Sequence, residues 1–467
     1  HSQAENIGSF QEVSGPHERA MTEFVVPRSV IDGTGEKKRL PQAADQYFSR
    51  AHHNPKSYDR IENWLPDVEQ FTFKTVMVPI SGAQAHAILK FRDEVKLRAA
   101  VRDQERREAS TKGADDGKSK GSYKVQEESK SVADEYAEKS INSNIFLDQT
   151  YEFLMQDWAR DPEVNSWRQS LEDLQNDLDK AIKIVAKEPG GSRQGAFVKL
   201  STRSPKDASL NMTKTYDYIR ARLKESKLRL TSDGKITKEI VREDLSLINE
   251  ACANSLCVRS GQEALRLILE SDRAHSDITA NRMYLEEGER FNLKIAVREW
   301  CEEYETDWEF RLFVMDGEPT ALTIYNDFFF DERIVAHKAE IEKQIMQLWE
   351  RVRDRIHRKS QNYCIDFALA ASLEKIFIIE VNNFVAPVAG SGLFDYHKEA
   401  DRKLLEEGPF SFRIRTKPLK NHAIEVEGVG FRTIHPPLTR MMMNERLQYV
   451  TEKTMATSLN IGSCTIL

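Results

Sequence analysis

The apolar residues of this chain fall mainly into short runs bounded by turn residues, and several runs alternate apolar with polar side chains. Runs of this length that are rich in β-branched and aromatic residues predict β-strands. The predicted strands are GAFVKL (195–200), SLCVR (255–259), LKIAVREW (293–300), WEFRLFV (308–314), PTALTIY (319–325), YCIDFALA (363–370), KIFIIEV (375–381) and FRIRTK (412–417). Asp316-Gly317 separates two of them and predicts a tight hairpin turn.

Two longer segments carry apolar residues at three- and four-residue spacings, which predicts amphipathic helices. In the first, Ser166 and Gln169 form a capping-box pattern at the start, and EPGG (188–191) would end the helix. The second covers 339–358, and residues 72–91 read as a strand that passes into a further helix. The inward positions are Trp167, Leu171, Leu174, Leu178, Ile182 and Val185 in the first helix, and Ile341, Ile345, Leu348, Trp349, Val352 and Ile356 in the second. Strands mixed with a few long helices favour an α+β fold with an antiparallel sheet.

Composition narrows the class of protein. The chain has 467 residues, with 68 Lys+Arg against 75 Asp+Glu and a net charge of −7, so its surface as a whole is no polycation for nucleic acid. No apolar run approaches the roughly 20 residues that a membrane helix needs, and HSQAENIGSF lacks the blocks of a signal peptide. The five cysteines are scattered without a CxxC pair, which supports neither a disulfide framework nor a zinc site. We therefore expect a cytoplasmic or nuclear protein.

Two stretches lack the apolar side chains that a core requires. Residues 1–57 are polar and irregular, and 98–140 are charged, Gly- and Ser-rich. Burial in 98–140 would not offset the entropy of ordering the backbone, so we expect a disordered charged insertion there. This insertion is either a solvated linker or a regulatory docking segment.

Side chains with carboxylate or amide oxygens lie on two neighbouring predicted strands. Glu380 and Asn382 alternate onto one strand face, and Asp366 lies in the preceding strand across a short turn. Carboxylate and amide oxygens suit Mg²⁺, which takes phosphate oxygens and waters for its other positions. The spacing therefore predicts a magnesium site, although acids at strand ends can also simply face water.

The segment 194–209 is the most distinctive cationic stretch. It is a strand that delivers Lys199 into a Ser/Thr/Pro loop with Arg203 and Lys206. Such cations suit phosphate groups, since lysine is a compact charge and arginine a bidentate fork. The chain has no GxxxxGK[ST] and no GxGxxG, which excludes a P-loop or Rossmann explanation.

Charges also interrupt apolar strands elsewhere. Glu309 and Arg311 lie two residues apart among bulky apolar residues, while Lys294, Arg298 and Trp300 share a face. A charge in the middle of a buried strand must be paired or bind a ligand. Glu309 and Arg311 therefore form either a structural ion pair or part of a site, and the other face is either a site or a solvated edge.

Two features lie near the C-terminus. Arg413, Arg415 and Lys417 alternate and so share one strand face, which is either solvated or faces an acidic substrate. Cys464 begins a C-a-a-X pattern, which would permit prenylation and membrane association; an ordinary polar tail is the alternative.

Taken in order, these segments resemble the ATP-grasp family of cell division cycle protein 123, an assembly factor for translation initiation factor two. FVKLSTRSPKDA is similar to the family's "F-P-K-L-N … S-P-K-D-A" block and WEFRLFV to its "E-F-R-x-F-V" strand. CIDFA is similar to "F-D-x-Y", FIIEVNNF to the "W-L-I-D-F-N-P-F" metal strand, and SGLF to a Leu-Leu-Phe. The resemblance covers roughly residues 60–95 and 145–420.

The resemblance implies an α+β ATP-grasp fold, in which two α+β lobes with mainly antiparallel sheets enclose an Mg-ATP cleft. Residues 58–97 would start the N-terminal lobe, and 141–290 would complete it with the phosphate-contacting loop. Residues 291–420 would form the C-terminal lobe with its hinge and metal strands, and 421–467 a C-terminal extension.

The resemblance also implies roles for single residues. Arg298, Glu299, Trp300 and Cys301 would lie by the adenine, Lys199 and Arg311 would contact phosphates, and Asp366, Glu380 and Asn382 would bind the magnesium. The sequence departs from the family at Ser201-Thr202, at Glu380 where the family has Asp, at 383–387, and in an additional insertion at about 217–250.

Our leading sequence-based hypothesis is a ligase that uses Mg-ATP to activate an acid by phosphoryl or nucleotidyl transfer, with Lys199, Glu309 and Arg311 as catalytic residues. Its acceptor would be a carboxylate or the end phosphate of an RNA, which makes RNA end-joining a variant. The alternatives are an ATP-bound assembly chaperone with a protein client, such as an initiation-factor subunit, and a degenerate ATP-grasp scaffold.

Overall fold

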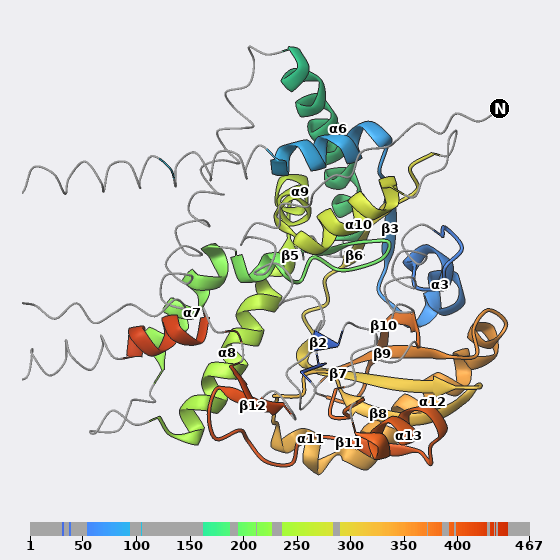
Figure 1. The fold of residues 1–467 in the computed structure, drawn as a ribbon, viewed down its shortest axis with the longest axis vertical. Helices are drawn as coiled ribbons and strands as arrows, with labels where there is room; N and C mark the ends of the chain where they lie inside the picture. The colour runs from blue at the N-terminus through green and yellow to red at the C-terminus, as the bar shows by residue number, and fades with distance from the viewer. Residues whose placement is uncertain are drawn as a thin grey trace, which may run out of the picture.

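The computed structural model describes residues 54–93, 162–186, 195–211, 213–226, 236–283, 290–370, 372–384, 392–396, 398–426, 430–433, 435 and 438–446, with short pieces at 30–31, 37–38 and 104. Two sheets organise these residues (Figure 1). The four-stranded sheet has the order β3-β6-β4-β5, and the five-stranded sheet has the order β10-β9-β7-β8-β11. All neighbouring strands are antiparallel except β11, which runs parallel to β8.

The bounds of the strands follow the apolar runs of the sequence closely. The four-stranded sheet comprises β3 (Thr75–Pro79), β4 (Ala196–Leu200), β5 (Cys257–Val258) and β6 (Lys294–Glu299). The five-stranded sheet comprises β7 (Tyr304–Met315), β8 (Glu318–Ile324), β9 (Tyr363–Ala370), β10 (Ile376–Asn383) and β11 (Ser411–Arg413). Two short ladders pair β1 (Val30–Ile31) with β2 (Lys37–Lys38) and β12 (Ala423–Val426) with β13 (Gly430–Thr433). The predicted α+β class with mainly antiparallel sheets is confirmed.

Helices cover the outer face of each sheet. The four-stranded sheet packs on α6 (Pro162–Val185), α9 (Gly261–Glu270) and α10 (Asp272–Met283), which together form one apolar core with its strands. The five-stranded sheet packs on α3 (Ile61–Val68), α11 (Glu332–Ala336) and α12 (Lys338–His357). The helix α13 (Glu399–Glu407) lies on the opposite face of that sheet, where Leu405 packs with Phe313 and Cys364. The short 3-10 helices are η1 (Glu69–Phe71) and η2 (Ala208–Asn211).

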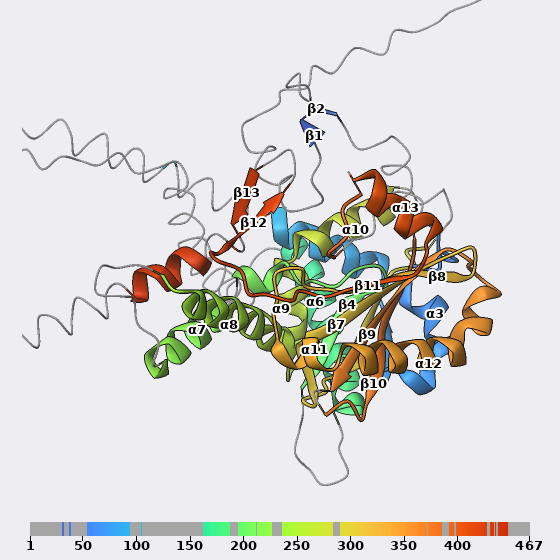
Figure 2. The same ribbon diagram turned by 90° about the horizontal axis from the view of Figure 1, so that it is seen from below.

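A third group of helices lies beside the two sheets. It comprises α7 (Thr213–Glu225), α8 (Lys238–Leu256) and a helix at 438–446, which Figure 2 shows in red next to α7 and α8. Leu438, Met441 and Met442 bury their side chains against these two helices. The segment at about 217–250 that we expected to be an insertion is therefore built largely of two packed helices.

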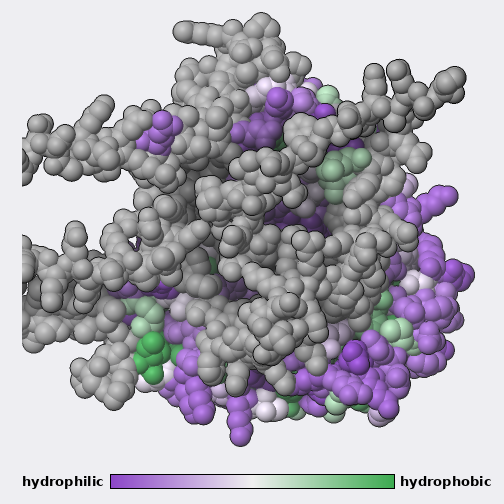
Figure 3. Space-filling view, in the orientation of Figure 1, coloured by the Kyte–Doolittle hydropathy of each residue, from purple (hydrophilic) through white to green (hydrophobic). Residues whose placement is uncertain are grey.

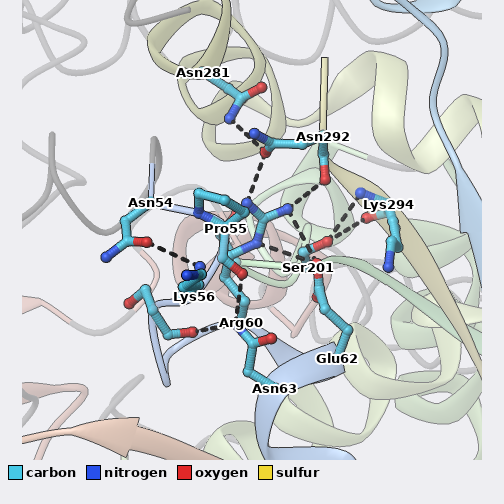
Figure 4. Close-up of polar contacts among 12 residues, drawn as sticks. Asn54, Pro55, Lys56, Arg60, Glu62, Asn63, Ser201, Asn281, Asn292 and Lys294 are labelled. Atoms are coloured by element: carbon cyan, nitrogen blue, oxygen red, sulfur yellow. Dashed lines mark hydrogen bonds and ion pairs between the residues drawn. The ribbon is translucent and has the colours of Figure 1, made fainter. Parts of the chain in front are cut away.

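Arg60 ties three parts of the chain together just before α3 (Figure 4). Its fully buried guanidinium donates to the Asn292 side chain at 2.7 Å, to the Asn292 carbonyl and to Glu62 at 3.2 Å. Asn281 of α10 also binds Asn292, and the backbone N–H of Ile61 donates to the Ser201 carbonyl at 2.9 Å. These bonds connect α3, on the five-stranded sheet, to the ends of β4 and β6 in the other sheet.

The local predictions divide into confirmed and wrong ones. Asp316 and Gly317 have φ of 50° and 78° and connect β7 to β8, as a type I′ hairpin turn requires. Ser166 does not cap a helix, because α6 already begins at Pro162. The predicted strands 255–259 and 412–417 shorten to Cys257–Val258 and Ser411–Arg413, since α8 extends to Leu256 and β11 ends early.

Two expected lobe boundaries also differ from the arrangement of the elements. β6 belongs to the segment expected in the second lobe but pairs with β3 and β4, and α3 belongs to the first expected lobe but packs with α12.

The predicted insertion at 98–140, apart from Gln104, and Cys464 lie outside the described residues. Within the described part of the chain, no helix combines the length and apolar character needed to cross a bilayer. The described surface around α12 and α13 is mostly hydrophilic on the face shown in Figure 3.

The crossing of α9 over α6 generates a prediction at Gly261. A Cβ atom there would lie 2.0 Å from the Gln175 carbonyl oxygen and 2.9 Å from the Asp179 backbone nitrogen, and neither backbone atom can move cheaply. We expect Gly261→Ala to lower the free energy of unfolding by about 2 kcal/mol, as overpacking does, in urea titrations followed by circular dichroism. Gly82→Ala is the matched control, because nothing lies within 4 Å of its Cβ position. Equal stability of the two variants would contradict the close crossing.

Candidate functional site

A pocket lies between the two sheets, with α8 along its side. Its volume is about 270 Å³. The four-stranded sheet contributes Phe197, Lys199 and Arg298, the five-stranded sheet contributes Glu309, Asp366, Ile379 and Glu380, and α8 contributes Asn249, Cys252, Ala253 and Leu256. The remaining lining residues are Phe73, Ser204, Lys206, Ser209, Glu299, Trp300, Cys301, Tyr304, Thr306, Tyr325, Asn326, Phe328 and His435.

Strand alternation sends the cations of the four-stranded sheet into this pocket. Val198 and Leu200 of β4 join the core under α6 and α9, so Lys199 between them points to the other face. In β6, Val297 is in the same core, and Arg298 pairs in register with Phe197 on the pocket face. Both cationic side chains are almost fully buried, with 2% exposed.

A β-bulge sends Glu380 into the pocket from the opposite side. The register of β10 against β9 passes from Ile378↔Phe367 directly to Glu380↔Asp366, so Ile379 has no partner. Ile378 and Val381 are consequently both buried in the core although they are three residues apart. Without the bulge, Glu380 would point into that core together with Ile378, so the extra residue creates the acidic side of the pocket.

Two cations of one sheet bind acceptors on β10 of the other sheet. Lys199 forms a short ion pair with Glu380, and Arg298 donates to the Ile379 carbonyl at 2.7 Å and to the Thr72 hydroxyl at 2.6 Å. Burial alone would raise the pKa of Glu380, but Lys199, with Arg311 and Lys206, lowers it to about 2. Burial lowers the pKa of Arg298 to about 10, which still leaves it charged near neutral pH.

Arg311 and Asp366 form a bidentate ion pair across β7 and β9. The Arg311 guanidinium donates to the two carboxylate oxygens at 2.7 and 2.8 Å, and it lies 4.9 Å from the Tyr325 ring centroid. Although burial disfavours the charge, Asp366 raises the pKa of Arg311 above its ordinary value. Arg311 is therefore held behind Asp366, and it is Asp366 that lines the pocket.

Lys206 and Glu309 form a more accessible pair. Lys206 Nζ lies 3.7 Å from a Glu309 carboxylate oxygen and 4.8 Å from the Tyr325 ring centroid, and 43% of its side chain is exposed. The Tyr304 hydroxyl donates a short hydrogen bond to Glu309. Lys206 is therefore accessible to a ligand in the pocket, while Glu309 remains mostly buried beside it.

The residues expected beside an adenine lie at one end of the pocket. Glu299 ends β6, Trp300 and Cys301 follow it directly, and all three line the pocket with Arg298. The backbone N–H of Trp300 donates a hydrogen bond to the Gly195 carbonyl at 3.3 Å, which keeps this segment beside β4. Phe197 and Leu256 add apolar surface there, so this end suits a planar base.

Other predicted residues do not line the pocket. Arg203 turns toward α10, where its guanidinium donates to the buried Asp277 carboxylate, which also accepts from the Thr202 hydroxyl. A buried carboxylate is costly unless such donors surround it. Asn382 is on the same strand face as Glu380 but opposite Cys364, outside the lining residues.

The predicted basic face of Arg413, Arg415 and Lys417 is wrong. β11 ends at Arg413, so the alternation of a strand does not continue to the other two residues. Arg413 binds Asp401 at 2.7 Å and Arg415 donates to the Asp327 carbonyl at 2.6 Å, while Lys417 is exposed. These side chains do not form a shared surface for an acidic acceptor.

The sequence analysis missed the side of the pocket formed by α8 and by the C-terminal segment. Asn249 and Cys252 lie on α8, whose apolar spacing at Ile240, Leu245 and Ile248 could have been recognised as a helix inside the supposed insertion. Tyr304, Tyr325 and His435 carried no motif, and only the tertiary structure identifies them.

The donor set at the acidic side fits a divalent cation. Asp366 and Glu380 lie directly opposite each other in β9 and β10, and both line the pocket. Among the described residues, no three His, Cys, Asp or Glu side chains are grouped to bind a metal by themselves. Two carboxylates without a full protein cage are what Mg²⁺ uses when phosphates complete its coordination.

The Lys199–Glu380 pair generates a stability prediction. Lys199→Met removes the cation and leaves the Glu380 carboxylate buried without it, so we expect the free energy of unfolding at pH 7 to fall by about 3 kcal/mol. Adding Glu380→Gln should recover most of this loss in the same urea titrations. The pKa of Glu380, about 2, lies below its unfolded value, so the contribution is present above pH ~4.3 and is lost as the pH falls toward 2. A double variant no more stable than Lys199→Met would refute the pairing.

Asp307 generates a prediction with the opposite pH dependence. Burial raises the pKa of this carboxyl to about 8, although the Asn249 side chain, which donates to it, acts in the other direction. A raised folded-state pKa means that stability falls as the pH rises from about 4 to about 8. Asp307→Asn should remove this dependence and stabilise the chain most at pH 8 and above, measured as melting temperature against pH. If the melting temperatures of the wild type and of Asp307→Asn depend on pH equally, the prediction is contradicted.

The comparisons with known proteins identify the family of this chain. No curated protein sequence matches the chain. The structure of Cdc123 from Schizosaccharomyces pombe is similar at 16% identity and a TM-score of 0.41, over 77% of this chain and 95% of that one. Its C-terminally truncated form is similar at 16% identity and a TM-score of 0.41, over 78% and 98%. The family model D123 matches residues 64–427, which is well over half of the sequence, and the chain therefore belongs to the D123 family.

Proposed function

We propose that the chain is an ATP-bound assembly chaperone, in which Mg-ATP occupies the pocket between the two sheets and stabilises a surface for a protein client. The two sheets would then be the two lobes of an ATP-grasp fold. The observation that carries the proposal is the charge arrangement of one pocket: cations on β4, β6 and the loop after β4 face carboxylates on β9 and β10.

The pocket offers each part of Mg-ATP a matching surface. The apolar end with Phe197, Trp300 and Leu256 suits the adenine, while Lys199 and Lys206 suit the phosphates as compact charges. Asp366 and Glu380 would hold magnesium, which neutralises phosphate charge when bound. Lys199 and Glu380 bind each other. In the proposed complex, a nucleotide phosphate would pair with Lys199 and the metal would pair with Glu380.

Family membership favours the chaperone over an enzyme. The D123 family model matches residues 64–427. Separately, the sequence motifs resemble those of an assembly factor for translation initiation factor two. The client we propose is accordingly a subunit of that factor. The ligase that leads the sequence analysis becomes the second candidate, favoured by the accessible Lys206–Glu309 pair in the pocket. RNA end-joining remains a variant of that ligase, in which the acceptor is the end phosphate of an RNA.

Nucleotide binding tests the site. We expect Glu380→Gln and Asp366→Asn to weaken ATP binding in the presence of Mg²⁺ by about tenfold or more, because each removes a carboxylate ligand of the metal. Isothermal titration calorimetry with and without Mg²⁺ measures this. Glu374→Gln, an exposed glutamate in the turn between β9 and β10, is the matched control and should bind like the wild type. Unchanged Mg-ATP affinity in both site variants would overturn the proposed pocket.

A second measurement separates the chaperone from the ligase. The chaperone should bind an initiation-factor-two subunit more tightly with Mg-ATP than without it, and Glu380→Gln should lose that difference in a pull-down. A ligase should instead release ADP or AMP in proportion to an added amino acid, peptide or RNA end. Acceptor-dependent product without client binding would replace the chaperone by the ligase.

A further inference from the structure

His435 reaches the pocket from a part of the chain that the family match does not include. The match ends at residue 427, whereas His435 lines the pocket beside Phe328, Asn326 and Tyr325. The rings of His435 and Phe328 meet edge to face, with centroids 6.3 Å apart and an interplanar angle of 89°. This side chain is therefore an addition to the pocket by the C-terminal segment of this chain.

The surrounding segment holds His435 firmly in place. The His435 carbonyl accepts a hydrogen bond from the Thr439 N–H at 3.0 Å, at the start of the helix 438–446. That helix buries Leu438 and Met442 against α7 and α8. At its far end Arg446 donates to the Asp244 carboxylate of α8 at 2.6 Å, and Asp244 has no exposed surface.

The same carboxylate fixes the segment on its other side. His422 Nε2 lies 2.9 Å from the second carboxylate oxygen of Asp244. Asp244 therefore joins the two ends of the chain section that carries His435, and a charge so deeply buried must keep such partners. His435 itself has φ of 44°, a left-handed conformation that non-glycine residues adopt rarely.

The position of α8 indicates which end of a ligand His435 would meet. Leu256 lies at the C-terminal end of α8, at the apolar end of the pocket with Phe197 and Trp300. Phe328 packs instead on Val241 and Leu245, nearer the N-terminus of the helix. Leu245 and Leu256 are eleven residues apart, which corresponds to about 16 Å at the rise of an α-helix. Phe328 and His435 are thus remote from the predicted adenine end, on the side where Lys206 and Arg311 lie over Tyr325.

We propose that His435 is a specificity-determining residue that donates a hydrogen bond to the terminal phosphates of the bound nucleotide and so favours ATP over AMP. The inference rests on the proposed Mg-ATP site. An imidazole carries at least one N–H donor in either protonation state, and bonds to charged oxygens are the strong ones. The C-terminal residues that Asp244 fastens to α8 place this donor at the end of the pocket away from the predicted adenine side.

The test uses two substitutions that both tolerate a left-handed backbone. His435→Gly removes the donor, and His435→Asn retains a side-chain N–H. In titrations of the full chain at fixed Mg²⁺, we expect His435→Gly to lose about tenfold in ATP affinity, which corresponds to about 1.4 kcal/mol, and less than about twofold in AMP affinity. His435→Asn should retain most of the preference for ATP. His337→Gly, which replaces an exposed histidine at the start of α12, should leave both affinities unchanged.

The outcomes separate this inference from the proposed function. If the affinities of His435→Gly for ATP and AMP fall together, His435 does not bind the terminal phosphates. The same conclusion holds if neither affinity falls while the wild type binds ATP. Absence of ATP binding by the wild type would overturn both proposals at once. Melting temperatures of the variants identify unfolding, and the ratio of ATP to AMP affinity stays informative when overall affinity changes.

Discussion

In the described part of the protein, the arrangement of the two sheets depends on buried charges that must find partners between them. Lys199 and Arg298 lie on the inner face of the four-stranded sheet with almost no exposure to solvent, and a buried cation without an acceptor would be very costly. Both find their acceptors on β10 of the five-stranded sheet, in the Glu380 carboxylate and the Ile379 carbonyl. The two sheets must therefore face each other in one register, and the pocket lies where apolar packing between them is replaced by these polar contacts.

The same constraint explains why the pocket suits an ionic ligand. Two of the cations that point into it already balance an acid, in the pairs Lys199–Glu380 and Lys206–Glu309. A ligand that brings both signs, such as a phosphate with its magnesium, can exchange with these pairs without leaving a bare charge. A neutral molecule could not do so, which is the physical reason for preferring a metal-bound nucleotide over other small ligands.

The helices beside the sheets give the pocket its third side. The C-terminal half of α8 contributes lining residues from Asn249 to Leu256, and the C-terminal segment is fastened to the helix through Asp244, with Arg446 and His422 as partners. Stability of the C-terminal segment and shape of the pocket are therefore linked through one buried carboxylate. In a chaperone this linkage would connect the nucleotide to a surface at which a client could bind.

The sequence by itself determined the local structure and the chemistry of the strands. Alternation placed Lys199 and Arg298 opposite core residues, the run 363–370 is a strand over its full predicted length, and Asp316-Gly317 forms the expected turn, because these depend on near neighbours only. Tertiary structure alone decided the bulge at Ile379, the partner of Arg203, and the entry of α8 and His435 into the pocket. Each of these depends on which distant segment covers a buried charge or an apolar face, and no spacing along the chain encodes that choice.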